Sequence, residues 1–492
     1  MVARNSPVDH DQGIFGTLAA VTNIGVAQTP MAQTPMARAQ AGRDLRQAVP
    51  RSSHAELALG PDRPDPVGLL EEQATTRVPD LVPVRHGRMM ESEFTFFRGA
   101  AIVMAADLAA GTPRTGITAQ ICGDAHLSNF GLFGSPERRL VFDVNDFDET
   151  YPGPWEWDVK RLAASVVIAA RGRGFSDAER RQAVVQTAAG YRTQMEELAG
   201  LGHLDAWYRH VDADELMREV APQLRSPRRK MAQQLLVKAR AHDSLQALAK
   251  LTRTVDGQLR IVSNPPVVMA VEDMVGVDPE QAAQVLAQVA ADYQSTLRPD
   301  VRNLFTQYRL VHIAQKVVGV GSVGTRAWVG LFLGRDGRDP LFLQAKEAQA
   351  SVVERFLPTG VDMNNGERVV LGQHLMQAAS DIFLGWAHTV GFDGVERDFY
   401  LRQLRDWKGS LDPQEVEPVG LALYGQLCGA TLALAHARTG DRMVIAGYLG
   451  TGPTFDRAIA DFAEAYADQN ARDYTVFLAA INQGRIAATP GV

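Results

Sequence analysis

Hydrophobic positions recur with helical spacing over most of the chain. Apolar residues three and four positions apart predict helices over 91–110 and over 154–174. The region 176–300 is richly charged and also follows mainly this spacing, which resumes from about residue 366. From residue 413 to the end the same pattern continues with few interruptions. The sequence therefore predicts a protein in which helices outnumber strands.

Shorter stretches alternate apolar and polar residues or are rich in β-branched residues, and these predict strands. Two of them, 116–122 and 139–147, lie between the first two helices. The region 310–348 is punctuated by glycine and predicts three strands, with the segment "GRDGRDP" as the hairpin turn between the last two. A further strand is expected over 398–404. Because strand-rich and helix-rich regions follow one another along the chain, the expected fold class is α+β.

The first 50 residues are rich in Ala, Gln, Pro and Thr and contain the near-repeat "AQTPMAQTPMA". Such a composition buries too little apolar surface to offset the entropy of ordering, so we expect a disordered tail over 1–50. The apolar stretch 14–27 is similar in length to the core of a signal peptide. Asp9 and Asp11 precede it beside a single Arg4, however, whereas a signal peptide begins with a positively charged segment. We therefore do not expect secretion.

The composition limits the kinds of partner that this protein is expected to bind and the compartment in which it is expected to occur. The net charge is −7, and a general nucleic-acid-binding protein usually has a basic excess, so no nucleic-acid partner is expected. No run of 18 apolar residues occurs, so no membrane partner is expected. Cys122 and Cys428 are the only cysteines, which is too few for a disulfide framework and suits a reducing, cytoplasmic compartment. The 492 residues suffice for two or three domains.

A loop with catalytic potential follows the first predicted strand. In "GDAHLSNFG", residues 123–131, Asp124 and Asn129 are five positions apart. Such a loop can place a carboxylate beside a substrate hydroxyl and aim an amide oxygen at a metal ion. Asp146, at the end of the next strand, could then hold Mg²⁺, which prefers oxygen ligands. Asp143 is a rival, although a mid-strand carboxylate is costly to bury without a partner. The alternative is an Asp- and Asn-rich turn whose side chains bond only to their own backbone.

A glycine-rich segment lies far downstream of this loop. Residues 317–332 contain Gly319, Gly321 and Gly324 with the spacing G-x-G-x-x-G. A dinucleotide-binding fold would need a helix directly after the third glycine, whereas a strand pattern follows here. Strand, glycine turn and strand are what a hairpin that covers nucleotide phosphates requires. Lys346 comes 22 residues after Gly324 at the end of an apolar strand. Taken alone, such a residue is more often a solvated lysine, but its place after the hairpin favours a functional role.

Three motifs around the loop resemble the aminoglycoside and choline phosphotransferase branch of the protein-kinase-like superfamily. "GDAHLSN" resembles its H-G-D-x-H-x-x-N loop, "VNDFDE" its I-D-F-D-D segment, and "WEWDVKRLA" the helix that follows. One departure is Cys122, where the family has a mainly structural histidine. The resemblance implies ATP and Mg²⁺ as cofactors. It also implies roles for six residues: Asp124 as the catalytic base, Asn129 and Asp146 as metal ligands, Asp148 as a helper in the metal site, and His126 and Asp158 as structural supports of the loop.

The downstream segment resembles the nucleotide-binding half of the same superfamily. "LFLQAKEA" resembles the V-A-I-K strand, which implies that Lys346 pairs with the α- and β-phosphates of ATP and with a helix glutamate. The three glycines would cover the phosphates. Glu354 and Glu367 are both candidates for the glutamate, and the sequence does not decide between them. Three basic residues either meet a substrate phosphate or form a solvated edge: Arg402, Arg405 and Lys408.

The catalytic loop and the nucleotide-binding segment occur in the reverse of the order usual in this superfamily, because Gly319 comes 195 residues after Asp124. A circular permutation explains the order, since chain termini are often close together and permutation is tolerated at surface sites. The segment 422–441 resembles the helix that normally precedes the catalytic loop, although 98–110 competes for that role. The expected fold is thus a circularly permuted, bilobal protein-kinase-like fold. Its helix-rich large lobe would combine residues 51–300 and 413–492, and its small antiparallel-sheet lobe would be 301–412.

Over residues 45–490 the chain resembles DUF2252, a bacterial family of uncharacterised proteins, through segments such as "CGDAHLSNFG", "QAASDIFLGW" and "FAEAYADQNARDY". This resemblance names no substrate. Together the motifs predict an ATP- and Mg²⁺-dependent phosphotransferase that acts on a hydroxyl of an unknown small-molecule acceptor. Transfer of AMP is one alternative, and a non-catalytic nucleotide-binding scaffold, a pseudokinase, is the other. The oligomeric state stays open.

Overall fold

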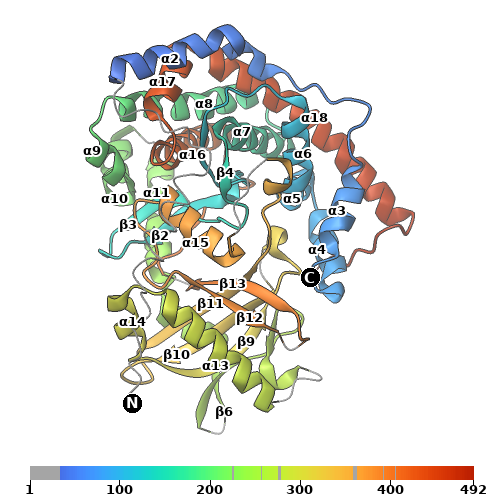
Figure 1. Cartoon of the computed structure of the whole chain (residues 1–492), viewed down its shortest axis with the longest axis vertical. Coiled ribbons are helices and arrows are strands. Elements are labelled where there is room, and N and C mark those ends of the chain that lie inside the picture. The colour runs from blue at the N-terminus through green and yellow to red at the C-terminus, as the bar shows by residue number, and fades with distance from the viewer. Residues whose placement is uncertain are drawn as a thin grey trace, which may run out of the picture.

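The computed structural model describes residues 34–223, 226–255, 257–274, 279–317, 319–357, 363–391, 393–404 and 406–491. Helices gather in one part of the molecule, and the largest sheet lies in the other part (Figure 1). All paired strands in the described ranges run antiparallel. The expected α+β class is therefore confirmed.

Helix α7, Trp155–Gly172, is the central element of the helical part. Every residue from Trp155 to Ala170 is buried, because α8 (Asp177–Ala199), α16 (Pro418–Ala437) and α18 (Thr454–Asn482) pack around it. These elements confirm the helices predicted over 154–174 and after residue 413. The remaining helices of this part include α3 Pro66–Ala74, α4 Val82–Met89, α9 His203–Tyr208, α10 Ala213–Val220 and α11 Ser226–Ala241.

Helix α16 is long and apolar enough to cross a membrane by length and composition alone. Within its most apolar window, 61% of the residues are buried inside the protein. Leu421, Cys428 and Leu432 are completely covered. The apolar character of this helix is thus accounted for by its contacts with α7 and α8.

The single helix predicted over 91–110 is two helices in the structure. Helix α5, Glu93–Gly99, begins with a capping box at Ser92, and α6, Ala101–Gly111, continues at an angle of 77° to it. The backbone leaves the helical region at Ala100, with φ −115° and ψ 38°. The apolar spacing continues across the bend because both helices bury most of their surface, so the pattern gave no sign of the break.

The expectation of disorder over 1–50 is wrong for its last part. Residues 1–33 lie outside the described ranges, but Pro35–Ala48 form helix α2, which packs against α17, Arg442–Leu449. Two glycines allow the close approach, since a Cβ on Gly42 would lie 2.1 Å from the Val444 carbonyl oxygen. A Cβ on Gly447 would similarly lie 2.2 Å from the carbonyl oxygen of Ala39. Small residues, rather than bulky apolar ones, make this contact, so low hydrophobicity was misleading.

The main sheet has six strands in the order β12-β13-β11-β10-β9-β8. The three strands and the hairpin predicted over 310–348 are confirmed as β9 Arg309–Lys316, β10 Ala327–Leu333 and β11 Pro340–Ala348. The predicted strand 398–404 is β13, Glu396–Gln403, and its partner β12, Gly385–Val390, was not predicted. The sheet is completed by β8 Val268–Ala270 and is accompanied by α13 Pro279–Thr296, α14 Pro299–Phe305 and α15 Asn365–Met376.

Two small sheets lie on the helical side and support the loops of interest. In one, β1 Thr118–Ile121 pairs with β4 Tyr151–Pro154. In the other, β2 Phe130–Gly134 pairs with β3 Leu140–Val144, which also meets β5 Val211–Asp212. The region 176–300 is less uniformly helical than predicted. Besides β5 and β8 it contains a hairpin of β6 Thr252–Val255 and β7 Gln258–Ile261, which follows α12 Ser244–Leu251.

Candidate active site

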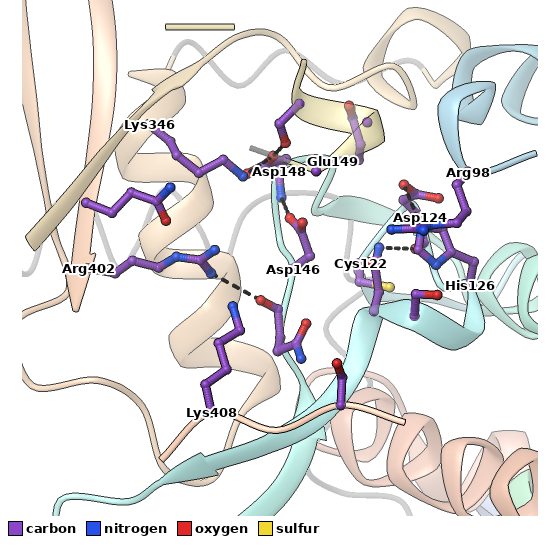
Figure 2. Close-up of a pocket in the computed structure, with 18 of the residues that line it drawn as sticks. Arg98, Cys122, Asp124, His126, Asp146, Asp148, Glu149, Lys346, Arg402 and Lys408 are labelled. Carbon is purple, nitrogen blue, oxygen red and sulfur yellow. Dashed lines mark hydrogen bonds and ion pairs between the residues drawn. The ribbon is translucent and has the colours of Figure 1, made fainter. Parts of the chain in front are cut away.

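A cavity of about 680 Å³ opens between the helical part and the main sheet. Its volume is within the range of roughly 300–1,000 Å³ that is typical of small-molecule sites. Figure 2 shows acidic side chains in its middle, with basic side chains on either side of them. Seven of the residues predicted to act in catalysis, metal binding or nucleotide binding line it: Asp124, Asn129, Asp146, Asp148, Gly319, Gly321 and Lys346.

Helix α7 holds the loop 123–131 from beneath. The carboxylate of Asp158 accepts hydrogen bonds from the backbone N–H groups of Cys122, at 2.7 Å, and Gly123, at 3.0 Å. Two turns further along, Ser165 Oγ accepts a hydrogen bond from Leu127 N at 3.1 Å. Gly123 has φ +75°, and a Cβ there would lie 2.2 Å from the Glu149 carbonyl oxygen, so only glycine fits. The structural role expected for Asp158 is thus visible as two direct contacts.

Asp124 lies at the mouth of this loop and is held by an arginine of α7. Its Oδ1 accepts a hydrogen bond from Arg161 Nε at 2.5 Å, and its Oδ2 lies 3.7 Å from His126 Nε2. Burial raises the pKa of Asp124 to about 7, against the opposing effect of Arg161. Burial lowers the pKa of His126, so that its imidazole is neutral. A carboxyl group that titrates near neutral pH in a cavity has the property required of a general base.

Asn129 and Asp146 offer oxygen atoms to the middle of the cavity. The Asn129 side-chain nitrogen donates a hydrogen bond to the Asp124 carbonyl oxygen at 2.8 Å, which leaves its amide oxygen on the opposite side. Asp146 Oδ1 accepts a hydrogen bond from Asp148 N at 3.2 Å, and its carboxylate lines the cavity. The rival Asp143 does not line the cavity; it is buried, accepts a hydrogen bond from Val144 N, and its pKa is raised by burial to about 7.

These donors fit Mg²⁺ of the kind that is bound together with phosphates. Among the described residues no cluster of three or more His, Cys, Asp or Glu side chains could hold a metal by itself. Mg²⁺ is commonly held by only one or two carboxylates together with substrate phosphates and water. Asp146 with the amide oxygen of Asn129 meets that smaller requirement.

Asp148 makes a different set of contacts from those of Asp146. Its Oδ2 lies 2.6 Å from Lys346 Nζ and accepts a hydrogen bond from Ser322 Oγ at 3.0 Å, and its Oδ1 accepts one from Tyr400 at 2.6 Å. Burial alone would raise the pKa of Asp148, but Lys346 and these hydrogen bonds lower it below its usual range. Burial likewise opposes the charge of Lys346, yet Asp146 and Asp148 raise the pKa of Lys346.

The glycine-rich turn reaches across the cavity from the main sheet. Gly319 and Gly321 line the cavity, next to the short 3₁₀ turn η6, Val320–Ser322. Gly324 faces away from the cavity with φ +91°, and its carbonyl oxygen accepts a hydrogen bond from Val78 N at 2.8 Å. The turn is therefore anchored on the helical side at its third glycine, while its first two glycines remain beside the cavity.

Neither glutamate proposed as the partner of Lys346 forms that ion pair in the described structure, because Lys346 pairs with Asp148. Glu354 begins the short turn η7, Glu354–Phe356, and Glu367 lies in the first turn of α15, where its N–H bonds to the Asn364 cap. Helix α15 contacts the acidic loop through Arg368 instead. This side chain donates to the carbonyl oxygens of Thr150, at 2.6 Å, and of Asp148, at 2.9 Å.

Two of the three basic residues at the end of β13 and just beyond it line the cavity. Arg402 donates a hydrogen bond to the Asn145 carbonyl oxygen at 3.1 Å, and Lys408 lies beside it (Figure 2). The positive charge of Arg402 lowers the pKa of Lys408 to about 7. Arg405 lies outside the described residues. Arg402 and Lys408 thus both line the cavity, with Arg402 half-buried and Lys408 still exposed to solvent.

Sequence reasoning missed several residues that shape the site. Arg161 could have been found, because Asp158, Arg161 and Ser165 recur at helical spacing and so lie on one face of the predicted helix. Tyr400 lies opposite Lys346 in the register of β11 and β13. It was missed because a tyrosine is an ordinary residue in a strand pattern. Arg85 and Arg98, which also line the cavity, precede the loop without any motif.

Comparison with known proteins identifies a family but no activity. The family model described as uncharacterized protein conserved in bacteria (DUF2252) matches residues 77–480. No curated protein and no solved structure matches the chain. The match covers both the loop at 123–131 and the strand that bears Lys346, so the residues of the cavity belong to the region that the family shares.

Proposed function

We propose a function for a chain that belongs to DUF2252: an ATP- and Mg²⁺-dependent phosphotransferase that acts on a hydroxyl of a small-molecule acceptor. One observation carries the proposal. Asp124, Asn129 and Asp146 line the same cavity as Gly319, Gly321 and Lys346, which come from a segment about 200 residues later. A turn whose polar residues served only their own backbone would not require a glycine turn and a buried lysine opposite it.

The positions of these residues favour a division of roles. Lys346 and the backbone of the glycine turn would bind the nucleotide phosphates, and Asp146 with Asn129 would hold Mg²⁺. The bound metal would neutralise charge on the phosphates during transfer. Asp124 would accept the proton of the acceptor hydroxyl, since its raised pKa suits proton exchange near pH 7. Arg161 and Asp158 would position the base, because both bind to the loop that carries it.

A circularly permuted kinase-like fold is part of the proposal. Lys346 lies on the third of three consecutive antiparallel strands, and helix α15 follows, as the lysine strand and the next helix do in kinases. Where α16 ends, Thr439 Oγ1 accepts a hydrogen bond from Gln120 N at 2.8 Å, at the strand that leads into the catalytic loop. This contact supports 422–441 as the helix that precedes the loop in an unpermuted chain.

The test is the affinity of the purified protein for ATP with Mg²⁺, measured by calorimetry for wild type and for Asp146→Ala. We expect metal-dependent binding that falls at least tenfold in the variant. Asp143→Asn is the control, because this carboxyl lies on the strand just before Asp146 but is buried and does not line the cavity. Equal affinities in Asp146→Ala and wild type would refute the proposal.

A second measurement distinguishes the chemistry. Acceptor mixtures are incubated with ATP labelled at the γ- or the α-phosphate, using wild type and Asp124→Asn. Label transferred from the γ-position and lost in Asp124→Asn supports phosphotransfer. Label transferred from the α-position would instead indicate transfer of AMP. Tight binding of ATP without any transfer would indicate a scaffold.

A further inference from the structure

Among the basic side chains that line the cavity, two groups lie on opposite sides of its acidic residues. Lys346, Arg402 and Lys408 lie on the side of the main sheet, and Arg98 lies on the opposite side next to Asp124 (Figure 2). Arg85 lines the cavity as well and comes from the same segment as Arg98. In the proposed function, the first group belongs to the nucleotide side. The second group, Arg85 and Arg98, is left without a role.

Arg85 is an unusual residue to bury, because only 1% of it is exposed. Its Nη2 donates to the Gly99 carbonyl oxygen at 2.7 Å and to Gln73 Oε1 at 2.8 Å, neither of which carries a charge. Its Nε and Nη1, and the Nε of Arg98, have no hydrogen-bond partner in the described part of the chain. A buried cation with unused donors is costly unless an anion compensates it.

Asp124 attracts Arg98 electrostatically and opposes the lowering of its pKa by burial, but among the described residues it forms no hydrogen bond with Arg98 or Arg85. Its carboxylate already has a direct partner in Arg161, with the 2.5 Å contact between Arg161 Nε and Asp124 Oδ1. Glu149 also faces the cavity, but its carboxylate accepts a hydrogen bond from Val352 N at 2.7 Å. Neither carboxylate therefore supplies a hydrogen-bond partner for the unused nitrogens of Arg85 and Arg98.

We infer that Arg85 and Arg98 bind an anionic group of the acceptor, a phosphate or a carboxylate, so that its hydroxyl lies at Asp124. This inference rests on the proposed function for the location of the reacting hydroxyl. Arginine suits the purpose because its planar fork of N–H donors matches both anions. The position of the acidic residues between the two basic groups keeps this anion apart from the nucleotide phosphates.

Inorganic phosphate and acetate serve as the probes. Each is titrated by calorimetry into full-length protein, first alone and then with Mg²⁺ and a non-hydrolysable ATP analogue at saturation. We expect one of the anions to bind in both conditions, and the tighter of the two identifies the group on the acceptor. Arg98→Gln should weaken this binding at least tenfold while changing the affinity for the ATP analogue less than threefold. Arg171→Gln, at an exposed ion pair far along α7, is the matched control and should change neither.

Arg98→Lys provides a second variant, because it keeps the charge and loses the fork, and it should bind the anion with intermediate affinity. Anion binding that is unchanged in Arg98→Gln, or that disappears once the ATP analogue is bound, would overturn the inference. These results are independent of the test with Asp146→Ala. Failure to bind ATP would remove the proposed function, whereas failure of the anion to respond to Arg98 would remove only the acceptor site.

Discussion

Asp158 offers the sharpest test of how α7 supports the candidate catalytic loop. Its Oδ2 accepts a hydrogen bond from Cys122 N and lies 3.2 Å from His436 Nε2, while its Oδ1 accepts one from Gly123 N. In Asp158→Asn the side chain keeps its shape, and the amide oxygen is expected to remain with Cys122 and His436. The new NH₂ group would then meet the N–H of Gly123, donor against donor. The substitution should therefore free the amide directly before Asp124.

The expected magnitude follows from the geometry. A hydrogen bond to a charged group contributes about 1.5–3 kcal/mol, and a buried donor without a partner costs a similar amount. We expect the free energy of local opening at Gly123 to fall by about 2–3 kcal/mol. Since each 1.4 kcal/mol is a factor of ten, amide exchange should accelerate roughly 30- to 150-fold.

Hydrogen–deuterium exchange, read by mass spectrometry on peptides that contain 118–130, measures this change directly. Asp456→Asn is the matched control, because Asp456 is also 1% exposed and pairs with Arg192 far from the loop. The control should leave exchange at 118–130 unchanged. If Asp158→Asn also left it unchanged, or if both variants accelerated it equally, the proposed support of the loop by α7 would be refuted.

Three further predictions concern other parts of the molecule. Lys346→Met should weaken ATP·Mg²⁺ binding at least tenfold in calorimetry, whereas Lys250→Met, at an exposed lysine of α12, should not; equal affinities would remove Lys346 from the site. Gly324→Ala should cost about 1–2 kcal/mol of stability in denaturant unfolding, because φ is +91° and the new Cβ would lie 3.0 Å from Arg77 Cβ, while Gly337→Ala has open space and should be neutral. Lys160 is fully buried, its Nζ has no hydrogen-bond partner among the described residues, and burial lowers its pKa to about 7. Between pH 7 and its unfolded value of 10.5 the unfolded chain binds the extra proton, so this lysine makes stability rise with pH, and Lys160→Met should remove about 3 kcal/mol of that rise between pH 7 and 9.5. Parallel stability curves for wild type and Lys160→Met would contradict the assignment of Lys160.

Local sequence patterns predicted those helices and strands whose burial follows from the spacing of their own apolar residues. Helix α7 is buried along its length and begins directly after Pro154, and the hairpin of β10 and β11 has its turn residues in place, so both were recognised. Helix α2 was missed because its contact with α17 depends on glycines, which carry no apolar signal. The bend between α5 and α6 was missed for the opposite reason, since buried apolar residues continue at helical spacing on both sides of it.

The candidate site was predictable where a motif places several residues together, and unpredictable where the partner comes from a distant segment. Asp158 followed from a motif, and Arg161 was within reach because it lies one turn beyond Asp158. The contact of Arg368 with the backbone of Asp148 and Thr150 joins segments more than 200 residues apart, and no local pattern records it. The expectation of a glutamate on this helix failed for the same reason.

The contacts of Asp148 suggest how the two parts of the molecule are joined at the cavity. Asp148 follows β3 on the helical side, whereas Lys346, Ser322 and Tyr400 all belong to the main sheet or its glycine turn. Both of its carboxylate oxygens are occupied by these donors, so a metal ion could bind there only by displacing them. Asp146 lies two residues before Asp148. It has no such hydrogen bonds to the sheet among the described residues, and its carboxylate lines the cavity. The two aspartates of the "NDFD" segment therefore differ in their contacts. Asp146 is available to a metal ion, whereas Asp148 holds Lys346 and the glycine turn against the candidate catalytic loop.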